Sequence, residues 1–380
     1  MENIKLEVGK NTIPFLIGCD CFQDIASYIS NFENDKIFIF TDTKVKDLYA
    51  NKFADILNVT FGINTIIIIM EEGEISKNAK TVYKSIEEFF HFGVTRSSIL
   101  LTLGGGVVGN TGGLIASLLF RGIRLMHFPT TLLSIHDSVT SIKQAVNYKL
   151  TMKNTIGTYY YPTVIFTDLH VLKTLPDNHL KSGVFELIKN GLILGGDHLD
   201  FLYDFLPEYK NADMATLEKA IKLGIEAKQS LLRIDPFEKN EAIIFEYGHT
   251  VGHAIELASN GLLSHGESVG LGIKCAALVS NKMNYLSYGD YITHNNLINL
   301  IDDYSLSDIP FSTDNLLELI MNDNKKGYID TNNGKIPMIL LREIGKTVGD
   351  SNSRYLTLVP LLLLRDSIEE IFSNNRILER

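Results

Sequence analysis

Histidines and acidic residues gather near position 250 of this chain, in a pattern that could bind a metal ion. The sequence GHTVGH at 248–253 is followed by SHGE at 264–267, so this short segment holds three of the chain's 10 histidines. In a helix, His249 and His253 are four residues apart and share one face, and His265 opens the next predicted helix. Neutral imidazole nitrogens are good ligands for Zn²⁺, so the cluster predicts a divalent metal site. The alternative is a helix hairpin whose histidines only cap and pack.

A glycine-rich segment could bind a nucleotide. The sequence GGGVVG at 104–109 follows a predicted strand, precedes a predicted helix and fits the pattern G-x-G-x-x-G. Glycines there let backbone N–H groups approach a pyrophosphate at a helix N-terminus. The acidic residue expected about 20 positions later is missing. Asp42, at the end of an earlier predicted strand, could bind ribose hydroxyls instead and would favour NAD over NADP; the alternative is that it only caps a helix.

Basic residues near predicted turns suggest a phosphate site. Arg121, Lys143 and Lys153 interrupt segments that are otherwise poor in Lys and Arg, and Asp137 and Asn154 lie among them. A planar guanidinium and two ammonium groups suit a phosphate dianion. The alternative for each residue is ordinary surface solvation.

Composition limits the class of protein. The chain has 380 residues, 45% of them hydrophobic, and a mean hydropathy of +0.08, which is enough for two domains with substantial cores. The net charge of −10 argues against nucleic acid or an anionic membrane as partner. Three cysteines are too few for a disulfide framework. The first residues lack a signal-peptide pattern and the apolar runs are too short for a membrane span, so we expect a soluble cytoplasmic protein.

The hydrophobic pattern changes along the chain. Short apolar runs alternate with helical patterns in the first half, which predicts a parallel sheet covered on both faces. The runs are at 36–40, 65–69, 97–103 and 125–128. Helical patterns then dominate, at 180–194, 215–232, 242–257 and 267–283. The sequence predicts an α/β nucleotide-binding domain over 1–171 and a mainly helical domain, binding metal and substrate, over 172–380, with the site in the cleft between them.

Together these motifs resemble the sugar phosphate cyclases, the family of dehydroquinate synthase. The resemblance extends from about Phe38 to Lys346 and rests on motifs in the family's order. These are 104–109, Arg121-Gly122, PTTL at 129–132, Asp137-Ser138, Lys153-Asn154, ELIK at 186–189, GHTVGH at 248–253 and HGE at 265–267. The resemblance implies the dehydroquinate synthase-like fold, NAD and a divalent metal (Co²⁺ or Zn²⁺) as cofactors, a sugar phosphate substrate and a homodimer.

Several residues depart from dehydroquinate synthase. Asn110 stands where that enzyme has Asp, the segment 141–147 replaces a Gly-Gly-Lys-Thr run, and Glu246 stands in place of Asn. Ala242 replaces an Arg that binds the substrate carboxylate. With the segment 323–328, these features resemble the 2-deoxy-scyllo-inosose synthase branch, whose substrate glucose 6-phosphate has no carboxylate. An Arg without a carboxylate partner would be a buried unpaired charge.

The resemblance assigns roles residue by residue. The family's metal ligands correspond to Glu186, His249 and His265. The residues expected to act in catalysis are Lys143, Lys189, Lys228, Glu246 and His253. The residues expected to bind substrate and its phosphate are Arg121, Asp137, Asn154 and Lys325. The cofactor-contact positions are Asp42, Glu74, Lys77, Gly105, Gly106, Val107, Asn110, Thr130, Thr131, Lys153 and Thr174.

The activity that this resemblance implies is a cyclisation without net redox change, in aminoglycoside biosynthesis. C4 of glucose 6-phosphate is oxidised by NAD⁺, phosphate leaves from C6, C4 is reduced again, and an aldol step closes a carbocycle. The nearest alternatives are 3-dehydroquinate synthase and a sedoheptulose 7-phosphate cyclase. More distant ones are a metal-dependent polyol dehydrogenase and a catalytically inactive binding subunit of the same fold.

Overall fold

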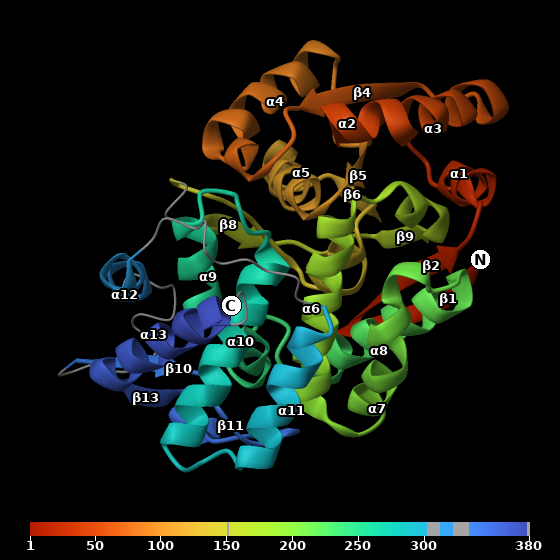
Figure 1. Ribbon diagram of the computed structural model, residues 1–380. Helices are drawn as coiled ribbons and strands as arrows, with labels where there is room; N and C mark the ends of the chain where they lie inside the picture. The colour runs from red at the N-terminus through yellow and green to blue at the C-terminus, as the bar shows by residue number, and fades with distance from the viewer. Residues whose placement is uncertain (150–151, 302–311, 322–333, 378–380) are drawn as a thin grey trace. The chain divides into compact units, whose positions relative to one another are not determined.

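The computed structural model describes residues 1–149, 152–301, 312–321 and 334–377, with side chains as far as residue 373 (Figure 1). The chain divides into two compact units. One comprises Met1–Pro176 with Lys228–Phe237, and the other comprises Asp177–Ala227 with Glu238–Arg380. Within the described residues, no helix is both long and apolar enough to cross a membrane.

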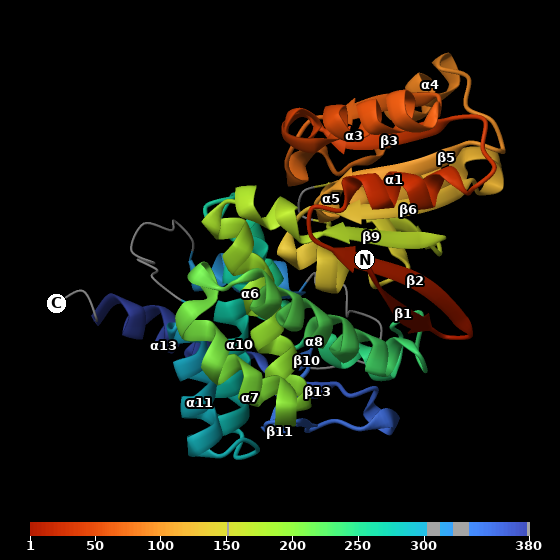
Figure 2. The same ribbon diagram turned by 90° about the vertical axis from the view of Figure 1, so that its right-hand side faces the viewer.

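A mixed sheet forms the centre of the first unit. Its strands, counted over the described residues, number seven in the order β1-β2-β9-β6-β5-β3-β4, and Figure 2 shows this order from β3 to β1. Neighbours from β2 to β4 pair in parallel, whereas β1 and β2 form an antiparallel hairpin at one edge. The strands are β1 (Glu2–Val8), β2 (Asn11–Gly18), β3 (Ile37–Asp42), β4 (Thr65–Met70), β5 (Ile99–Gly104), β6 (Arg124–Pro129) and β9 (Val164–Asp168).

Helices cover both faces of this sheet, and alternate residues of a central strand enter opposite cores. Ile37 and Ile39 of β3 pack in the core that includes α1 (Phe22–Ser30) and α3 (Asn51–Asp55). Phe38 and Phe40 pack in the core that includes α4 (Ala79–His91) and α5 (Gly106–Leu118). Because both faces are buried, the strand sequence is continuously apolar instead of alternating. The predicted α/β fold with a parallel sheet is confirmed.

Shorter elements complete the first unit and form several of its loops. They are α2 (Thr43–Val45), η1 (Lys46–Ala50), η2 (Ile56–Thr60), η3 (Glu74–Ser76), η4 (Leu119–Arg121), η5 (Ser134–Ser138), β7 (Lys143–Val146), β8 (Ile156–Tyr159) and η6 (Leu169–Thr174). Strands β7 and β8 pair as an antiparallel hairpin separate from the main sheet.

The second unit is mainly helical, as the sequence predicts. Its helices are α6 (Asp177–Leu194), α7 (Gly196–Phe205), α8 (Met214–Leu232, whose end belongs to the first unit), α9 (His249–Ala258), α10 (His265–Lys282), α11 (Tyr288–Asn299), α12 (Thr313–Met321) and α13 (Leu361–Ile377). Shorter elements are η7 (Leu206–Asn211), η8 (Glu241–Glu246), β10 (Lys335–Met338), β11 (Leu341–Glu343), β12 (Lys346–Thr347), η10 (Ser351–Ser353) and β13 (Thr357–Pro360).

One predicted helix was wrong in extent. The sequence predicts a single helix over 242–257, but the structure has the helical turn η8, a break at Tyr247-Gly248, and then α9. Gly248 adopts a left-handed φ of 79°, which glycine tolerates because it has no Cβ atom. The break lets the chain change direction immediately before His249.

Candidate active site

The three helices that carry the predicted metal ligands pack with their backbones in contact. A Cβ atom at Gly266 of α10 would lie 2.4 Å from the backbone of Ser182 in α6. One at Gly272 would lie 2.0 Å from the carbonyl oxygen of Gly248, and real Cβ contacts are essentially never shorter than 3.0 Å. Glycine is therefore required at both positions for α6, α9 and α10 to approach so closely.

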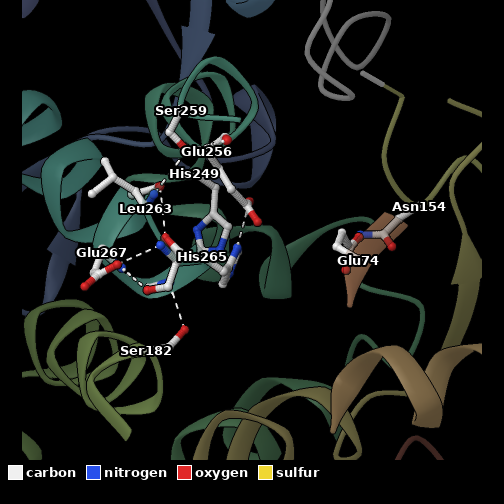
Figure 3. Close-up of polar contacts among 12 residues, drawn as sticks. Glu74, Asn154, Ser182, His249, Glu256, Ser259, Leu263, His265 and Glu267 are labelled. Atoms are coloured by element: carbon white, nitrogen blue, oxygen red, sulfur yellow. Dashed lines mark hydrogen bonds and ion pairs between the residues drawn. The ribbon is translucent and has the colours of Figure 1, made fainter. Parts of the chain in front are cut away.

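The start of α10 is held by a capping box, which Figure 3 shows. The Ser264 hydroxyl accepts a bond from the backbone N–H of Glu267, and the Ser264 N–H donates to Glu267 Oε2 at 2.6 Å. The N–H of Gly266 donates to Ser182 Oγ at 2.9 Å, which ties this end of α10 to α6. These contacts set the position of His265, the first residue of the helix.

Glu186, His249 and His265 come together as a candidate metal centre. Their ligand atoms all lie within 4.8 Å of one another. Nε2 of each histidine lies 3.4 Å from Glu186 Oε1. A tetrahedral ion with bonds of about 2.1 Å has ligand atoms about 3.4 Å apart, so the spacing fits Zn²⁺ or an ion of similar size. Three protein ligands leave a coordination position open for substrate.

Both imidazoles are oriented through their other nitrogen. His249 Nδ1 lies 3.1 Å from the carbonyl oxygen of Tyr247, which can only accept a hydrogen bond, so Nδ1 carries the proton. His265 Nδ1 lies 3.1 Å from Glu256 Oε2 (Figure 3). Donation from Nδ1 leaves the Nε2 lone pair of each ring directed to the centre, as metal-bound histidines require.

The Glu186 carboxyl at this centre is held in its anionic form. Burial alone would raise the pKa of the Glu186 carboxyl, but the close Lys189 ammonium and His249 hold that pKa well below its usual range. Burial lowers the pKa of His249. Burial acts in the same direction on His265, but Glu256 and Glu186 outweigh it and raise its pKa to about 10. A ligating imidazole is neutral, so a divalent cation would displace that proton.

Most of the other predicted residues of the second unit are near the three metal ligands in the sequence. The ring of His253 has its centroid 5.1 Å from that of His249 and 6.0 Å from that of His265. Glu246 is half-buried at the end of η8, and Ala242 is buried on the same turn. Lys189 is buried next to Glu186. Lys325 lies outside the described residues.

In the first unit, the glycine segment joins a strand to a helix as predicted. Gly104 ends β5, Gly105 caps α5, and Gly106 begins it. The N–H of Thr130 donates to the Gly104 carbonyl at 3.0 Å. A Cβ at Gly105 would lie 3.1 Å from the Thr131 side chain. Val107 follows in the first turn of the helix. The predicted cofactor residues from 105 to 107 and from 130 to 131 therefore meet at the carboxyl ends of β5 and β6, where such sheets bind ligands.

Asp42 and Asn110 make structural contacts that the sequence did not distinguish from ligand binding. Asp42 ends β3, and its Oδ1 accepts bonds from the N–H groups of Lys44 and Val45. It is therefore the N-cap of α2. Burial raises the pKa of its carboxyl. Asn110 Nδ2 donates to the Gly106 carbonyl at 2.9 Å, and its Oδ1 accepts from the N–H of Ala145 at 3.3 Å, which joins α5 to β7.

Asn147, which has no assigned role in the sequence analysis, connects three of the predicted residues. Its Nδ2 donates to Glu74 Oε1 at 2.9 Å, and its Oδ1 accepts from the N–H of Asn154 at 2.9 Å. Lys77 Nζ donates to Asn154 Oδ1 at 2.6 Å, and the Lys77 carbonyl accepts from the N–H of Asn147. Asn154 is held at a left-handed φ of 53°, and Figure 3 shows it beside Glu74. Predicted cofactor and phosphate contacts thus share one network.

A second pair in this unit joins Lys228 to Asp137. Lys228 Nζ lies 2.8 Å from Asp137 Oδ1, and Lys228 is buried. Lys143 begins β7 and Lys153 lies in the loop before β8; both are half-buried. Arg121 is exposed at a left-handed turn before β6, and within the described residues no hydrogen bond joins it to another predicted phosphate ligand. Thr174 is exposed, and its hydroxyl contacts that of Tyr49 at the end of η6.

Comparison with known proteins agrees with these features. Profiles described as 3-dehydroquinate synthase N-terminal and C-terminal match residues 67–182 and 183–326. The 2-deoxy-scyllo-inosose synthase of Niallia circulans is 37% identical over 358 residues, covering 94% of this chain and 96% of that protein. A crystal structure of 2-deoxy-scyllo-inosose synthase complexed with carbaglucose-6-phosphate, NAD⁺ and Co²⁺ has a TM-score of 0.90 and 36% identity, over 97% of this chain and 100% of that one.

A third protein shares the fold at lower identity. The 2-epi-5-epi-valiolone synthase from Streptomyces hygroscopicus, with NAD⁺ and Zn²⁺ bound, has a TM-score of 0.82 at 19% identity, over 97% of this chain and 98% of that one. The similarity of the first two comparisons covers both units of the chain almost completely. The resemblance seen in the motifs is confirmed, and this chain belongs to the dehydroquinate synthase-like family of sugar phosphate cyclases.

Proposed function

We propose that this chain is a 2-deoxy-scyllo-inosose synthase, converting D-glucose 6-phosphate to 2-deoxy-scyllo-inosose and inorganic phosphate. The reaction comprises oxidation at C4, elimination of phosphate from C6, reduction at C4, ring opening and an intramolecular aldol step. The observation that carries the proposal is the centre of Glu186, His249 and His265 in a chain 36% identical to a synthase bound to carbaglucose-6-phosphate, NAD⁺ and Co²⁺.

The bound groups are assigned to the two sets of residues described above. When bound, NAD supplies a reversible hydride acceptor, and Co²⁺ or Zn²⁺ polarises oxygen atoms and lowers the pKa of a hydroxyl. Glu186, His249 and His265 would hold the cation. The glycine segment, Asp42 and the Glu74–Lys77 turn would hold NAD.

The chain's own side chains would bind the sugar phosphate and move protons. Lys189, buried against Glu186, keeps that carboxylate ionised and offers N–H donors to substrate hydroxyls. Lys228, which is paired with Asp137, would likewise offer N–H donors to substrate hydroxyls. The residues assigned to the phosphate group are Arg121, Lys143, Asn154, Lys325 and His253. The Glu246 carboxylate accepts hydrogen bonds from sugar hydroxyls and takes up a proton.

Two residues favour glucose 6-phosphate over a carboxylate substrate. Ala242 is 1% exposed, so the position where dehydroquinate synthase has an arginine is a small, buried and uncharged side chain here. The Glu246 carboxylate would repel a second carboxylate and suits hydroxyl groups. These features support the inosose synthase over 3-dehydroquinate synthase.

A phosphate-release assay tests the proposal. Protein purified with NAD and Co²⁺ or Zn²⁺ is offered glucose 6-phosphate, sedoheptulose 7-phosphate and the seven-carbon precursor of dehydroquinate in parallel. We expect release from glucose 6-phosphate without net NADH, loss of activity with a chelator, and recovery on adding Co²⁺. Turnover of sedoheptulose 7-phosphate or of the dehydroquinate precursor, without turnover of glucose 6-phosphate, would contradict the proposal. Accumulation of NADH would indicate a polyol dehydrogenase.

We also propose that the active form is a homodimer, as is usual in the family. Light scattering on the purified chain tests this directly, and a monomer with full activity would contradict it.

A further inference from the structure

We propose that Glu256 positions the metal ligand His265, holding its ring in the tautomer and orientation that a bound cation needs, and so determines the affinity of the site for that cation. This inference rests on the proposed metal centre and not on the identity of the sugar phosphate.

Glu256 stands where one helix can serve both histidine ligands. It follows His249 by seven residues on α9, which is two helical turns along the same face. Its carboxylate reaches across to α10, where Oε2 lies 3.1 Å from His265 Nδ1. The Glu256 side chain is only 15% exposed, so solvent screens the contact weakly. Helix α9 therefore supplies one ligand itself and the support of another.

The two histidine ligands differ in how they are oriented. His249 uses the carbonyl of Tyr247, a backbone atom that directly precedes the helix. His265 depends on a side chain that could rotate away. Its own side chain is 29% exposed, against 9% for His249 and 0% for Glu186, so packing restrains it least of the three ligands. A hydrogen bond to Nδ1 matters most for the ligand that packing holds least.

The chemistry of the contact fits a positioning role. A carboxylate that accepts a hydrogen bond from Nδ1–H keeps the proton on that nitrogen and leaves the lone pair on Nε2. Nε2 of His265 lies 3.4 Å from Glu186 Oε1. Without that acceptor, the ring can carry its proton on Nε2 or turn its other edge to the centre, and either change removes a ligand. Outer partners of this kind typically change metal affinity by about 10- to 100-fold.

Cobalt binding to the full chain, without NAD or substrate, tests the inference. The dissociation constant for Co²⁺ is measured by competition with a chromophoric chelator, and the visible absorption of Co²⁺ reports the ligand geometry. We expect Glu256→Ala to weaken binding by about 10- to 100-fold. Glu256→Gln keeps an acceptor for the Nδ1 proton and should retain most of the affinity and the wild-type spectrum.

A matched control separates this role from a general effect on α10. Glu370→Ala removes a carboxylate that lies 2.8 Å from Lys282 at the opposite end of the same helix, and should leave Co²⁺ affinity unchanged. If Glu256→Ala fails to fold, Glu256→Asp draws the carboxylate back by one methylene, keeps its charge, and should still weaken binding several-fold.

The outcomes are distinct. Wild-type affinity in both Glu256→Ala and Glu256→Asp would overturn the inference, and so would equal losses in the Gln and Ala variants. A wild-type chain that binds no Co²⁺ would instead refute the metal centre on which the proposed function rests.

Discussion

Replacing Gly272 by Ala tests whether the backbone contact between α9 and α10 sets the metal centre. The added Cβ would lie 2.0 Å from the Gly248 carbonyl oxygen and 2.7 Å from the Gly252 nitrogen. Reaching the 3.0 Å limit of real Cβ contacts requires the two backbones to separate by about 1 Å at this point. Because His249 directly follows Gly248, this displacement would move a metal ligand. Metal–ligand distances vary by only about 0.2 Å, so a shift of this size should weaken metal binding.

The effect on stability can be estimated. Overpacking of this kind costs about 1–3 kcal/mol, and alanine offsets roughly 1 kcal/mol of it through its higher helix propensity. We therefore expect Gly272→Ala to lower the free energy of unfolding by up to about 2 kcal/mol. A folded protein of ordinary stability survives such a loss, so metal binding can still be measured.

Gly289→Ala is the matched control. Gly289 lies in α11 with a negative φ, and the nearest atom to its added Cβ would be Ser287 Oγ at 3.8 Å. This variant should be as stable as wild type or more stable by up to about 1 kcal/mol, with unchanged metal affinity. Urea unfolding of the metal-free proteins and Co²⁺ titration measure both quantities. If Gly272→Ala matched Gly289→Ala in both, close helix contact would not be what positions His249.

Three further changes test other parts of the molecule. Asn147→Asp puts a second carboxylate at hydrogen-bonding distance from Glu74 and should weaken NAD binding about tenfold by calorimetry; unchanged NAD affinity would remove the network from the cofactor site. Burial lowers the pKa of His127 to about 3, so the unfolded state alone takes up its proton between its ordinary pKa and pH 3, and stability falls as pH drops. This amounts to about 2 kcal/mol at pH 5 relative to neutral pH, and His127→Gln should lose that part of the pH dependence in urea unfolding. Glu246→Gln should lower kcat for phosphate release by about 100-fold if its carboxylate moves a proton; a change confined to KM would reduce its role to binding.

Local patterns in the sequence predicted strands β3, β4, β5 and β6 and the long helices α6, α8 and α10 of the described chain, but not β9, which lies inside the sheet between β2 and β6. Residues 37–40 are apolar throughout because both faces of β3 are buried, and that pattern is readable without a structure. The hairpin of β1 and β2 was also missed. β1 is an edge strand in which charged residues alternate with apolar ones, so it lacks the continuous apolar run of the central strands. The break at Tyr247-Gly248 was also missed, because one glycine inside a helical period is a weak signal.

The residue types available for chemistry can be read from the amino-acid sequence: histidines four residues apart on one face, a Glu-Leu-Ile-Lys motif on another helix, and glycines at a strand–helix junction. How these residues combine depends on long-range contacts in the folded chain. The contact of Gly266 with Ser182 spans 84 residues of sequence, and that of Asn147 with Glu74 spans 73. Supporting residues such as Glu256 and Asn147 form hydrogen bonds with neighbours that folding brings close. Such partners have no characteristic spacing, so sequence patterns do not reveal them.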